Sequence, residues 1–285
     1  MDKLQLTDEQ VNKIVDLALA EDTSHGDITS KILIPLELVS KASIVTNGEG
    51  VLAGGDIARL VFLKVDPLLE VEVLILEGSR LKPGDTVATI SGTVVSIFKA
   101  ERVALNFLSH LSGVASETAR YVAEIQGSTA VITDTRKTSP SLRLLEKYAV
   151  RVGGGQNHRL HLGDGILIKD NHITALRELG ISLRDIVAKA KQNAPQGVKI
   201  EIEVNTIQEA LETAQAGADI IMLDNMSPDE IKQVVELVPE QVKLEASGGI
   251  GLDNVRAMAR AGVDFISVGA ITHSAKALDF SLELR

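Results

Sequence analysis

Hydrophobic and polar positions follow two different patterns along the chain. Between residues 41 and 90, short runs rich in β-branched residues are separated by Gly and Pro and interrupted by one helical stretch. The predicted strands are Ala42–Thr46, Val71–Leu76 and Thr86–Ile90, and the predicted helix is Asp56–Lys64. This pattern is typical of a small α+β sandwich domain.

An amphipathic helix is predicted ahead of this region. Thr7 and Gln10 have the spacing of a capping box, and residues 11, 14, 15 and 18 place apolar side chains on one helix face. Residues 21–29 are polar and are predicted to form a loop. The chain therefore begins with a helix and a loop that lead into the sandwich.

A longer helix leads out of the sandwich and sets the predicted domain boundary. Its pattern runs from Ser96 to about Ile125, with an expected break near Ser112-Gly113. We therefore predict an N-terminal helix plus α+β sandwich domain over residues 1–112 and a catalytic domain over residues 113–285. The tail after about residue 271 can pack back on the N-terminal domain.

After Gly127 short buried runs alternate regularly with helical patterns, which predicts a parallel sheet. The predicted strands are Ala130–Thr133, Ile166–Ile168, Lys199–Val204, Ile220–Leu223, Val242–Ala246 and Phe265–Val268. A complete eightfold barrel usually needs about 250 residues, more than follow Gly127. The fold class is therefore α/β, with an incomplete six- or seven-stranded parallel α/β barrel. A doubly wound sheet is the alternative, although the G-x-G-x-x-G fingerprint of dinucleotide binding is missing.

Composition narrows the functional classes. Cys is absent, which excludes disulfides and thiolate metal sites. A net charge of −10, with 2% aromatic residues and no Trp, argues against nucleic-acid binding. No apolar run reaches the ~18 residues of a membrane span, and the first residues lack a signal-peptide layout. We therefore expect a cytoplasmic protein that binds neither membranes nor nucleic acids.

Candidate chemistry gathers where the predicted strands end, which is where parallel α/β folds place their active sites. Four cations lie at or beside these ends: Arg136, Lys137, Arg159 and Lys169. Crowding of like charges is costly unless anions match them, so the arrangement predicts a polyanionic ligand. The alternative is that these side chains are scattered surface residues that form unrelated ion pairs.

Acidic and glycine-rich strand ends complete the candidate site. Glu203 and Asp224 can hold Mg²⁺ or accept hydrogen bonds from sugar hydroxyls, or can simply cap the helices that follow. The late glycine turns resemble the phosphate loops of barrels, with backbone N–H groups directed at phosphate oxygens; their residues are Ser247, Gly248, Gly249 and Gly269.

Two other kinds of chemistry find little support. His158, His161 and His172 have no regular zinc-binding spacing, so donation from His158 to a ligand carboxylate is favoured over a zinc site. The G-x-S-x-G nucleophile elbow is absent, which leaves serine-hydrolase chemistry unsupported.

Seven segments together resemble the quinolinate phosphoribosyltransferase family. They are Glu101-Arg102-Val103-Ala104-Leu105-Asn106, Asp134-Thr135-Arg136-Lys137-Thr138, Gly153-Gly154-Gly155-Gln156-Asn157-His158-Arg159, Ile168-Lys169-Asp170-Asn171-His172, Leu223-Asp224-Asn225-Met226, Ala246-Ser247-Gly248-Gly249 and Val268-Gly269-Ala270-Ile271-Thr272-His273. The resemblance extends from Glu21 to Leu282. Ser139-Pro140-Ser141 departs from the Thr-Pro-Gly expected for the family and leaves the neighbouring cations untouched.

The resemblance implies a reaction and an assembly. Quinolinate and phosphoribosyl pyrophosphate would give nicotinate mononucleotide, pyrophosphate and CO₂ in NAD biosynthesis. The reaction would depend on Mg²⁺ and need no organic cofactor. The resemblance also implies a homodimer, in some members a hexamer, in which Arg102 completes the quinolinate pocket of the partner subunit.

The resemblance also assigns roles to the candidate residues. Quinolinate would be bound by Arg102, Arg136, His158, Arg159 and Lys169, and Thr135 would be a further substrate-binding residue. Lys137 would be shared between the two substrates and, with Glu203 and Asp224, would be catalytic. The same two acids would hold the ribose hydroxyls or Mg²⁺, and Ser247, Gly248, Gly249 and Gly269 would cradle phosphate. Transfer to a different acceptor, as in molybdate-transport-linked relatives, and a non-catalytic phosphate-ester-binding protein remain the alternatives.

Overall fold

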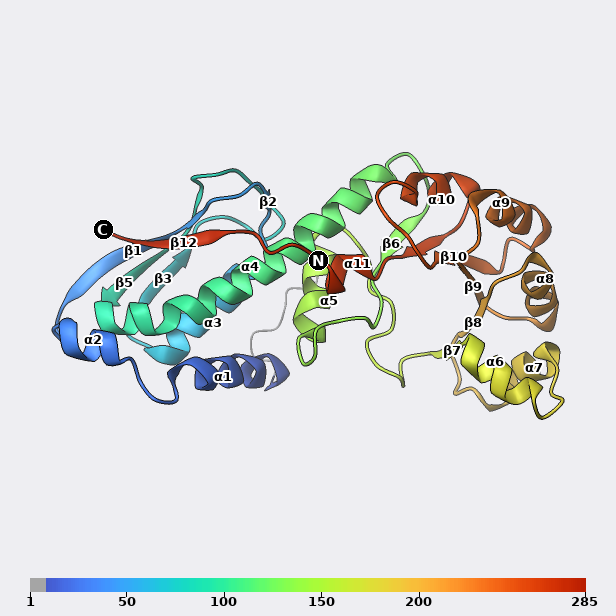
Figure 1. Ribbon diagram of the computed structural model, residues 1–285, viewed down its shortest axis with the longest axis horizontal. Helices are drawn as coiled ribbons and strands as arrows, with labels where there is room; N and C mark the ends of the chain where they lie inside the picture. Colours follow the sequence, from blue (N-terminus) through green and yellow to red (C-terminus); the bar gives the residue numbers. More distant parts are fainter. Residues whose placement is uncertain (1–8) are drawn as a thin grey trace. The chain divides into compact units, whose positions relative to one another are not determined.

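The computed structural model describes residues 9–285, and it divides into two compact units (Figure 1). One unit contains residues 9–119 together with Thr138–Gly154 and Ile271–Arg285. The other contains Arg120–Lys137 and Gly155–Ala270. The chain therefore passes between the units more than once, and the segment from Ile271 onward belongs to the first unit. The predicted capping box at Thr7 lies outside the described residues.

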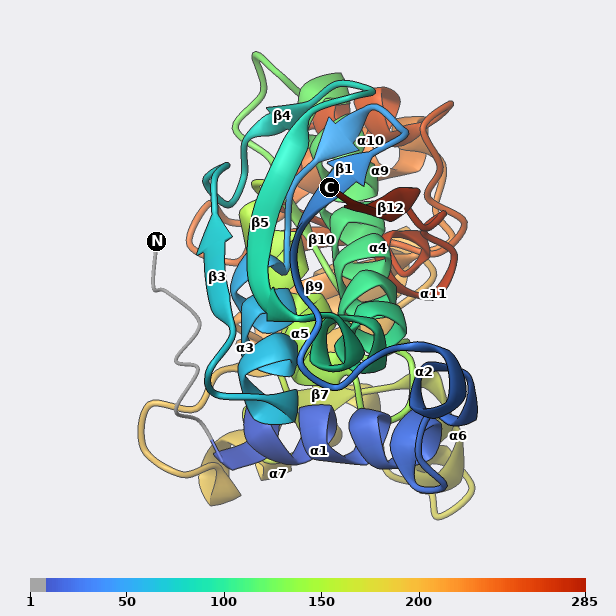
Figure 2. The same ribbon diagram turned by 90° about the vertical axis from the view of Figure 1, so that its left-hand side faces the viewer.

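The first unit is built on an antiparallel four-stranded sheet with the order β12-β1-β5-β3. The strands are β1 (Val39–Thr46), β3 (Glu70–Val73), β5 (Thr86–Thr93) and β12 (Phe280–Leu284). Helices α3 (Gly55–Val65) and α4 (Val94–Glu124) lie along one face of this sheet, as Figure 2 shows. The remaining elements are α1 (Glu9–Thr23), α2 (Ile28–Leu33), the pair β2 (Gly50–Val51) and β4 (Arg80–Leu81), and α5 (Arg143–Val152).

Helix α2 occupies part of the segment that was predicted to be a loop. Asp27 caps it, because its carboxylate accepts hydrogen bonds from both the backbone N–H (3.0 Å) and the hydroxyl of Ser30. A carboxylate at this position satisfies an N–H group that has no partner within the helix. The loop predicted over residues 21–29 is confirmed for residues 24–27, while α1 extends to Thr23 and α2 begins at Ile28, because a helix as short as α2 shows no clear apolar period in the sequence.

Helix α4 runs without interruption through Gly113, where a break was predicted. A Cβ at this position would lie 2.5 Å from the carbonyl oxygen of Lys276 and 3.1 Å from the Cα of Ala277. The glycine therefore permits the C-terminal segment to approach the helix closely, and it does not end the helix. Local sequence could not reveal this, because the contacting residues are distant in the chain.

The second unit is a six-stranded parallel sheet with helices on its outer side (Figure 1). The strands are β6 (Val131–Thr133), β7 (Ile166–Ile168), β8 (Ile200–Val204), β9 (Ile220–Asp224), β10 (Lys243–Ser247) and β11 (Phe265–Ser267). The helices are α6 (Asp170–Arg177), α7 (Leu183–Asn193), α8 (Ile207–Ala216), α9 (Pro228–Leu237) and α10 (Val255–Ala261), and the short α11 (Ala270–His273) follows β11. Each predicted strand matches an observed one, with bounds that agree within one residue.

The strand order distinguishes a barrel from a doubly wound sheet. Strands β7 to β11 follow one another across the sheet in chain order, and the first strand, β6, pairs with the last, β11. A doubly wound sheet would instead reverse its strand order at an internal switch point. The fold is therefore the predicted incomplete α/β barrel, and it is open between β6 and β7. Among residues 9–285, no helix has both the length and the apolar character that a bilayer crossing requires.

Candidate active site

A pocket of about 480 Å³ lies at the carboxyl ends of the barrel strands. Eleven of the thirteen predicted site residues line it: Thr135, Arg136, Lys137, His158, Arg159, Lys169, Glu203, Asp224, Ser247, Gly248 and Gly249. The other lining residues are Leu167, Met222, Asn225 and Ser267. Residues from the carboxyl ends of all six strands thus line one pocket, as expected for a parallel sheet.

The four predicted cations all line this pocket. Burial lowers the pKa of Arg159 first, and the charge of Arg136 lowers it further. One guanidinium N–H of Arg159 donates to the carbonyl of Gly165 (3.3 Å), and the Lys169 ammonium lies 3.6 Å from a Glu203 oxygen. The two guanidinium groups of Arg136 and Arg159 therefore disfavour each other's charge, which favours binding of an anion between them.

Two acids face the same pocket from adjacent strands, Glu203 near the end of β8 and Asp224 at the end of β9. Burial is the main cause that raises the pKa of Glu203, and the charges of Asp224 and Asp170 raise it further, against the opposing effect of Lys169. Carboxylate oxygens are ligands that Mg²⁺ prefers, so this pair fits a magnesium ion as well as sugar hydroxyls.

Two consecutive glycines form the turn after β10. Gly248 and Gly249 both have positive φ, +82° and +59°, in the left-handed region that L side chains rarely adopt. A Cβ on Gly248 would also lie 2.4 Å from an oxygen of Asn225. Glycine is thus required at this turn, where successive backbone N–H groups can surround an anion.

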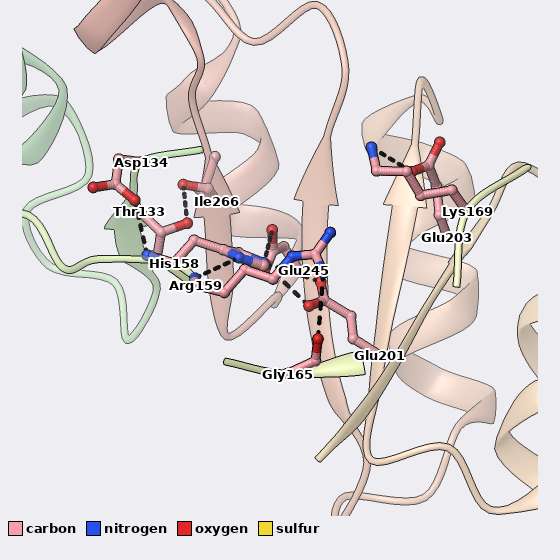
Figure 3. A network of polar contacts seen from close by, with 10 residues as sticks. All are labelled: Thr133, Asp134, His158, Arg159, Gly165, Lys169, Glu201, Glu203, Glu245 and Ile266. Atoms are coloured by element: carbon pink, nitrogen blue, oxygen red, sulfur yellow. Dashed lines mark hydrogen bonds and ion pairs between the residues drawn. The ribbon is translucent and has the colours of Figure 1, made fainter. Parts of the chain in front are cut away.

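His158 is held by contacts on both sides of its ring (Figure 3). Its backbone N–H donates to the fully buried Asp134 (2.8 Å), which also accepts from the amide of Asn157 (2.7 Å). Its Nδ1 accepts from the backbone N–H of Arg159 (2.8 Å), and its Nε2 lies 3.1 Å from a carboxylate oxygen of Glu201. With Nδ1 as an acceptor, the ring carries its proton on Nε2 and donates it to Glu201.

Glu201 and Glu245 are two residues of this network to which the sequence analysis gave no role. Both are buried, with 6% and 2% of their surface exposed, and Glu245 lies 3.7 Å from the Nε2 of His158. One nitrogen of His158 and one oxygen of each glutamate lie within 4.8 Å of one another, the spacing of a metal site. The proton on Nε2 occupies the lone pair that a metal would need, so the geometry favours a hydrogen-bonded network. The sequence signal was acids placed between apolar residues within predicted buried strands.

Burial, with the nearby charge of Glu201, raises the pKa of Glu245 to about 7, from an ordinary 4.5. The folded state therefore binds a proton that the unfolded state has lost, and this stabilisation disappears as the pH rises through 7. We expect Glu245→Gln, which cannot ionise, to be more stable than the wild type at pH 8.5 by about 1–3 kcal/mol and to differ little at pH 5. Urea unfolding at both pH values would test this, and equal pH dependence in the two proteins would contradict it.

Arg102 and Gly269 do not line the pocket. Arg102 lies on α4 in the first unit, where 63% of its side chain is exposed and its nearest acidic partner is Glu101, at 3.7 Å. Gly269 follows β11. Of the other histidines considered, His161 pairs with Asp164 (2.7 Å), and the Nδ1 of His172 accepts from the backbone N–H of Lys169 (2.9 Å).

His158 and Arg159 also separate this pocket from a second one. A cavity of about 440 Å³ is lined by both residues and by residues at the amino ends of the strands, among them Lys199, Ile220 and Phe265. Glu201 and Glu245 line this second cavity and are absent from the first. The histidine–glutamate network therefore lies beneath the cationic pocket, in the interior of the barrel.

An open barrel whose strand ends direct cations, acids and a glycine turn at one cavity defines an enzyme for anionic, phosphorylated substrates. Two family models match the chain: the N-terminal domain of quinolinate phosphoribosyl transferase over residues 27–112 and its C-terminal domain over residues 114–283. Together they span both units, and the chain belongs to the quinolinate phosphoribosyltransferase family.

Individual relatives agree with this assignment along nearly the whole chain. A probable nicotinate-nucleotide pyrophosphorylase (carboxylating) of Bacillus subtilis is 41% identical over 275 residues, which cover 96% of this chain and 93% of the relative. A decarboxylating quinolinate phosphoribosyltransferase of Nicotiana glauca is 38% identical over 290 residues. The aligned region covers 96% of this chain and 82% of the relative. The crystal structure of NadC from Streptococcus pyogenes superposes with a TM-score of 0.94 at 42% identity and 99% coverage of both chains.

Proposed function

We propose that this enzyme transfers the phosphoribosyl group of phosphoribosyl pyrophosphate to quinolinate and releases pyrophosphate and CO₂, forming nicotinate mononucleotide in NAD biosynthesis. The observation that carries this proposal is the cationic pocket at the carboxyl ends of the strands. Quinolinate has two adjacent carboxylates and the other substrate carries phosphate and pyrophosphate, so both substrates are polyanions that match the four cations lining the pocket.

Binding of quinolinate is assigned to the cations on one side of the pocket. Arg136 and Arg159 can grip carboxylates through two parallel hydrogen bonds, whereas Lys169 acts as a compact charge. His158 can donate to a carboxylate only if its Nε2–H leaves Glu201, since its other ring nitrogen is engaged by Arg159. These contacts would orient the pyridine nitrogen toward the ribose.

The transfer step replaces one bond at the anomeric carbon of the ribose with another. The C–O bond to pyrophosphate breaks, positive charge develops at that carbon, and the pyridine nitrogen donates the electron pair of the new C–N bond. Glu203 and Asp224 lie in the pocket as carboxylates that can stabilise this charge, and Lys137 can stabilise the departing pyrophosphate. Thr135 supports the position of Lys137 by accepting its backbone N–H (3.0 Å).

Phosphate and magnesium have separate proposed sites. Ser247, Gly248 and Gly249 would receive the 5-phosphate at their turn, with Gly269 next to the last strand. Glu203 and Asp224 would hold Mg²⁺ or the ribose hydroxyls, and Mg²⁺ would supply charge neutralisation for the leaving pyrophosphate. Titration of Mg²⁺ into the protein, followed by calorimetry with and without phosphoribosyl pyrophosphate, tests this assignment.

Loss of CO₂ follows from the product of the transfer step. The ribosylated ring nitrogen is cationic, so it stabilises the electron pair left on the adjacent carbon when the carboxylate departs as CO₂. A proton then takes the place of the carboxylate. This electron sink belongs to the substrate, so the reaction requires no organic cofactor.

We further propose that the active form is a homodimer, with association into a hexamer as an extension, and that Arg102 reaches the pocket of the partner subunit. An exposed arginine on a helix outside the barrel gains a role in this arrangement, as a further cation for the quinolinate carboxylates.

The deciding experiment measures product release from purified protein. With quinolinate, Mg²⁺ and phosphoribosyl pyrophosphate, we expect equal amounts of pyrophosphate, CO₂ and nicotinate mononucleotide. With nicotinate as acceptor we expect little turnover, because a single carboxylate leaves part of the cationic pocket unmatched. Efficient turnover of another acceptor would favour the alternative transferase, and tight binding of phosphate esters without turnover would favour a non-catalytic protein.

A further inference from the structure

Asn225 has an unusual backbone conformation at the end of β9. Its φ is +56°, and among residues 9–285 only Ser141 shares a positive φ with it outside the glycines. The left-handed conformation costs an L residue free energy. Asn225 also lines the cationic pocket, so the strained residue lies at the site of the chemistry.

The side chain of Asn225 lies between the acid at the end of β9, Asp224, and the glycine turn after β10, at Gly248. Its Nδ2 donates to Oδ2 of Asp224 at 2.7 Å, and this orientation of the amide is required because a carboxylate only accepts. Its Oδ1 therefore turns toward Gly248, where it lies 2.4 Å from the place a Cβ would take. Its backbone N–H donates to the carbonyl of Ser247 at 2.9 Å.

These contacts fix the Asp224 carboxylate against the glycine turn. The amide of Asn225 holds Oδ2, and Asp224 itself lines the cationic pocket. The Oδ1 of Asp224 lies 2.7 Å from the Cβ position of Gly248, so a side chain there would displace the acid as well as the amide. One residue thus sets the relative position of an acid on β9 and a turn after β10.

A simpler interpretation is that Asn225 only provides a turn, since Asn tolerates a positive φ better than most residues. A turn needs the backbone conformation and not the side chain. Glycine would then replace Asn225 without loss, because it adopts a positive φ freely. The two interpretations therefore predict different behaviour of the same variant.

We propose that Asn225 is a positioning residue for phosphoribosyl pyrophosphate: it holds the Asp224 carboxylate and the Gly248-Gly249 turn at the separation that joins the ribose and phosphate ends of this substrate. The inference rests on the proposed function, and it adds a specific determinant of affinity for one of the two substrates. Asp224 and the turn touch the substrate, whereas Asn225 acts through them.

The test compares Asn225→Gly with Ser141→Gly. Ser141 is the other non-glycine residue with a positive φ among residues 9–285, and it does not line the cationic pocket, so it serves as the matched control. We expect Asn225→Gly to raise the KM for phosphoribosyl pyrophosphate about tenfold and to change the KM for quinolinate less than about twofold. The Tm should be nearly unchanged, and the control variant should match the wild type in both KM values.

A double-mutant cycle separates positioning from a general structural effect. If Asn225 acts through Asp224, then Asn225→Gly should add little to the loss already caused by Asp224→Asn. Asn225→Asp, which keeps the shape but places a second carboxylate beside Asp224, should impair the substrate affinity more than Asn225→Gly does.

Three results would overturn the proposal: an unchanged KM for phosphoribosyl pyrophosphate in Asn225→Gly, an equal rise of both KM values with a lower Tm, or fully additive effects with Asp224→Asn. Calorimetric binding of phosphoribosyl pyrophosphate without quinolinate provides a readout that is independent of turnover. A wild-type protein that binds this substrate but releases no CO₂ would refute the proposed reaction, while the binding comparison would still decide the role of Asn225.

Discussion

Replacing Arg159 by Ala should raise the KM for quinolinate by about 100-fold, since loss of one charged partner of a carboxylate typically costs 2–5 kcal/mol. Arg159 lines the pocket beside Arg136, and burial together with that neighbouring charge lowers its pKa. In the absence of substrate the same substitution removes the repulsion with Arg136 but also the hydrogen bond to the Gly165 carbonyl and the attraction of Glu201 and Asp164. We therefore expect the Tm of the free enzyme to change little while affinity falls.

A loss of affinity for quinolinate without a loss of Tm distinguishes a binding arginine from a structural one. Arg159→Lys keeps the charge but loses the planar fork, so it should lie between Ala and the wild type. Arg184→Ala, on the exposed surface of α7, is the matched control and should leave both quantities unchanged. A loss of Tm in Arg159→Ala without a change in the KM for quinolinate would show that the pocket does not bind this substrate.

Mixing two inactive variants should restore activity if Arg102 acts in the partner's pocket. Arg102→Ala and Lys137→Ala are each expected to lower kcat/KM by at least about 100-fold, because each removes a charge from every site. A hybrid dimer would contain one site with both defects and one with neither. With random exchange between symmetric subunits, about a quarter of all sites would be intact.

The recovery must depend on subunit exchange to support a shared site. Differently tagged variants would show by co-purification that hybrids form, and refolding the mixture would promote exchange. The double variant Arg102→Ala/Lys137→Ala mixed with wild type is the control, since its hybrids should contain two sites with one defect each. Proven exchange without recovered activity would remove the shared-site proposal and leave the within-subunit roles untouched.

The second unit was predictable from sequence because its strands are short, apolar and separated by amphipathic helices. Strands β8 and β9 were predicted within one residue of their observed bounds. In the first unit the break predicted at Gly113 was wrong, because this glycine permits close contact with the distant segment near Lys276 and does not end α4. Periodicity records which residues are buried, but not which remote segment buries them.

The candidate site was predictable to the extent that it consists of strand ends. Lys169 and Asp224 come directly after or at the end of apolar runs, and parallel topology brings such positions together. The histidine–glutamate network beneath the pocket was harder to predict. Glu201 and Glu245 lie within strands, and their roles depend on the position of His158. Asn225 likewise shows its importance only through a φ angle and a contact across two strands.

Strand β12 has a consequence for the integrity of the protein. It pairs with β1 from Ala42 to Thr46, and it buries Phe280 (Figure 2). A chain ending at residue 279 would leave the hydrogen-bonding groups of β1 exposed along a flat edge, which invites pairing with other molecules. The last six residues therefore protect the edge of β1 from pairing with other molecules. Deleting them should reduce the yield of soluble protein before it lowers the catalytic activity of the protein that remains soluble.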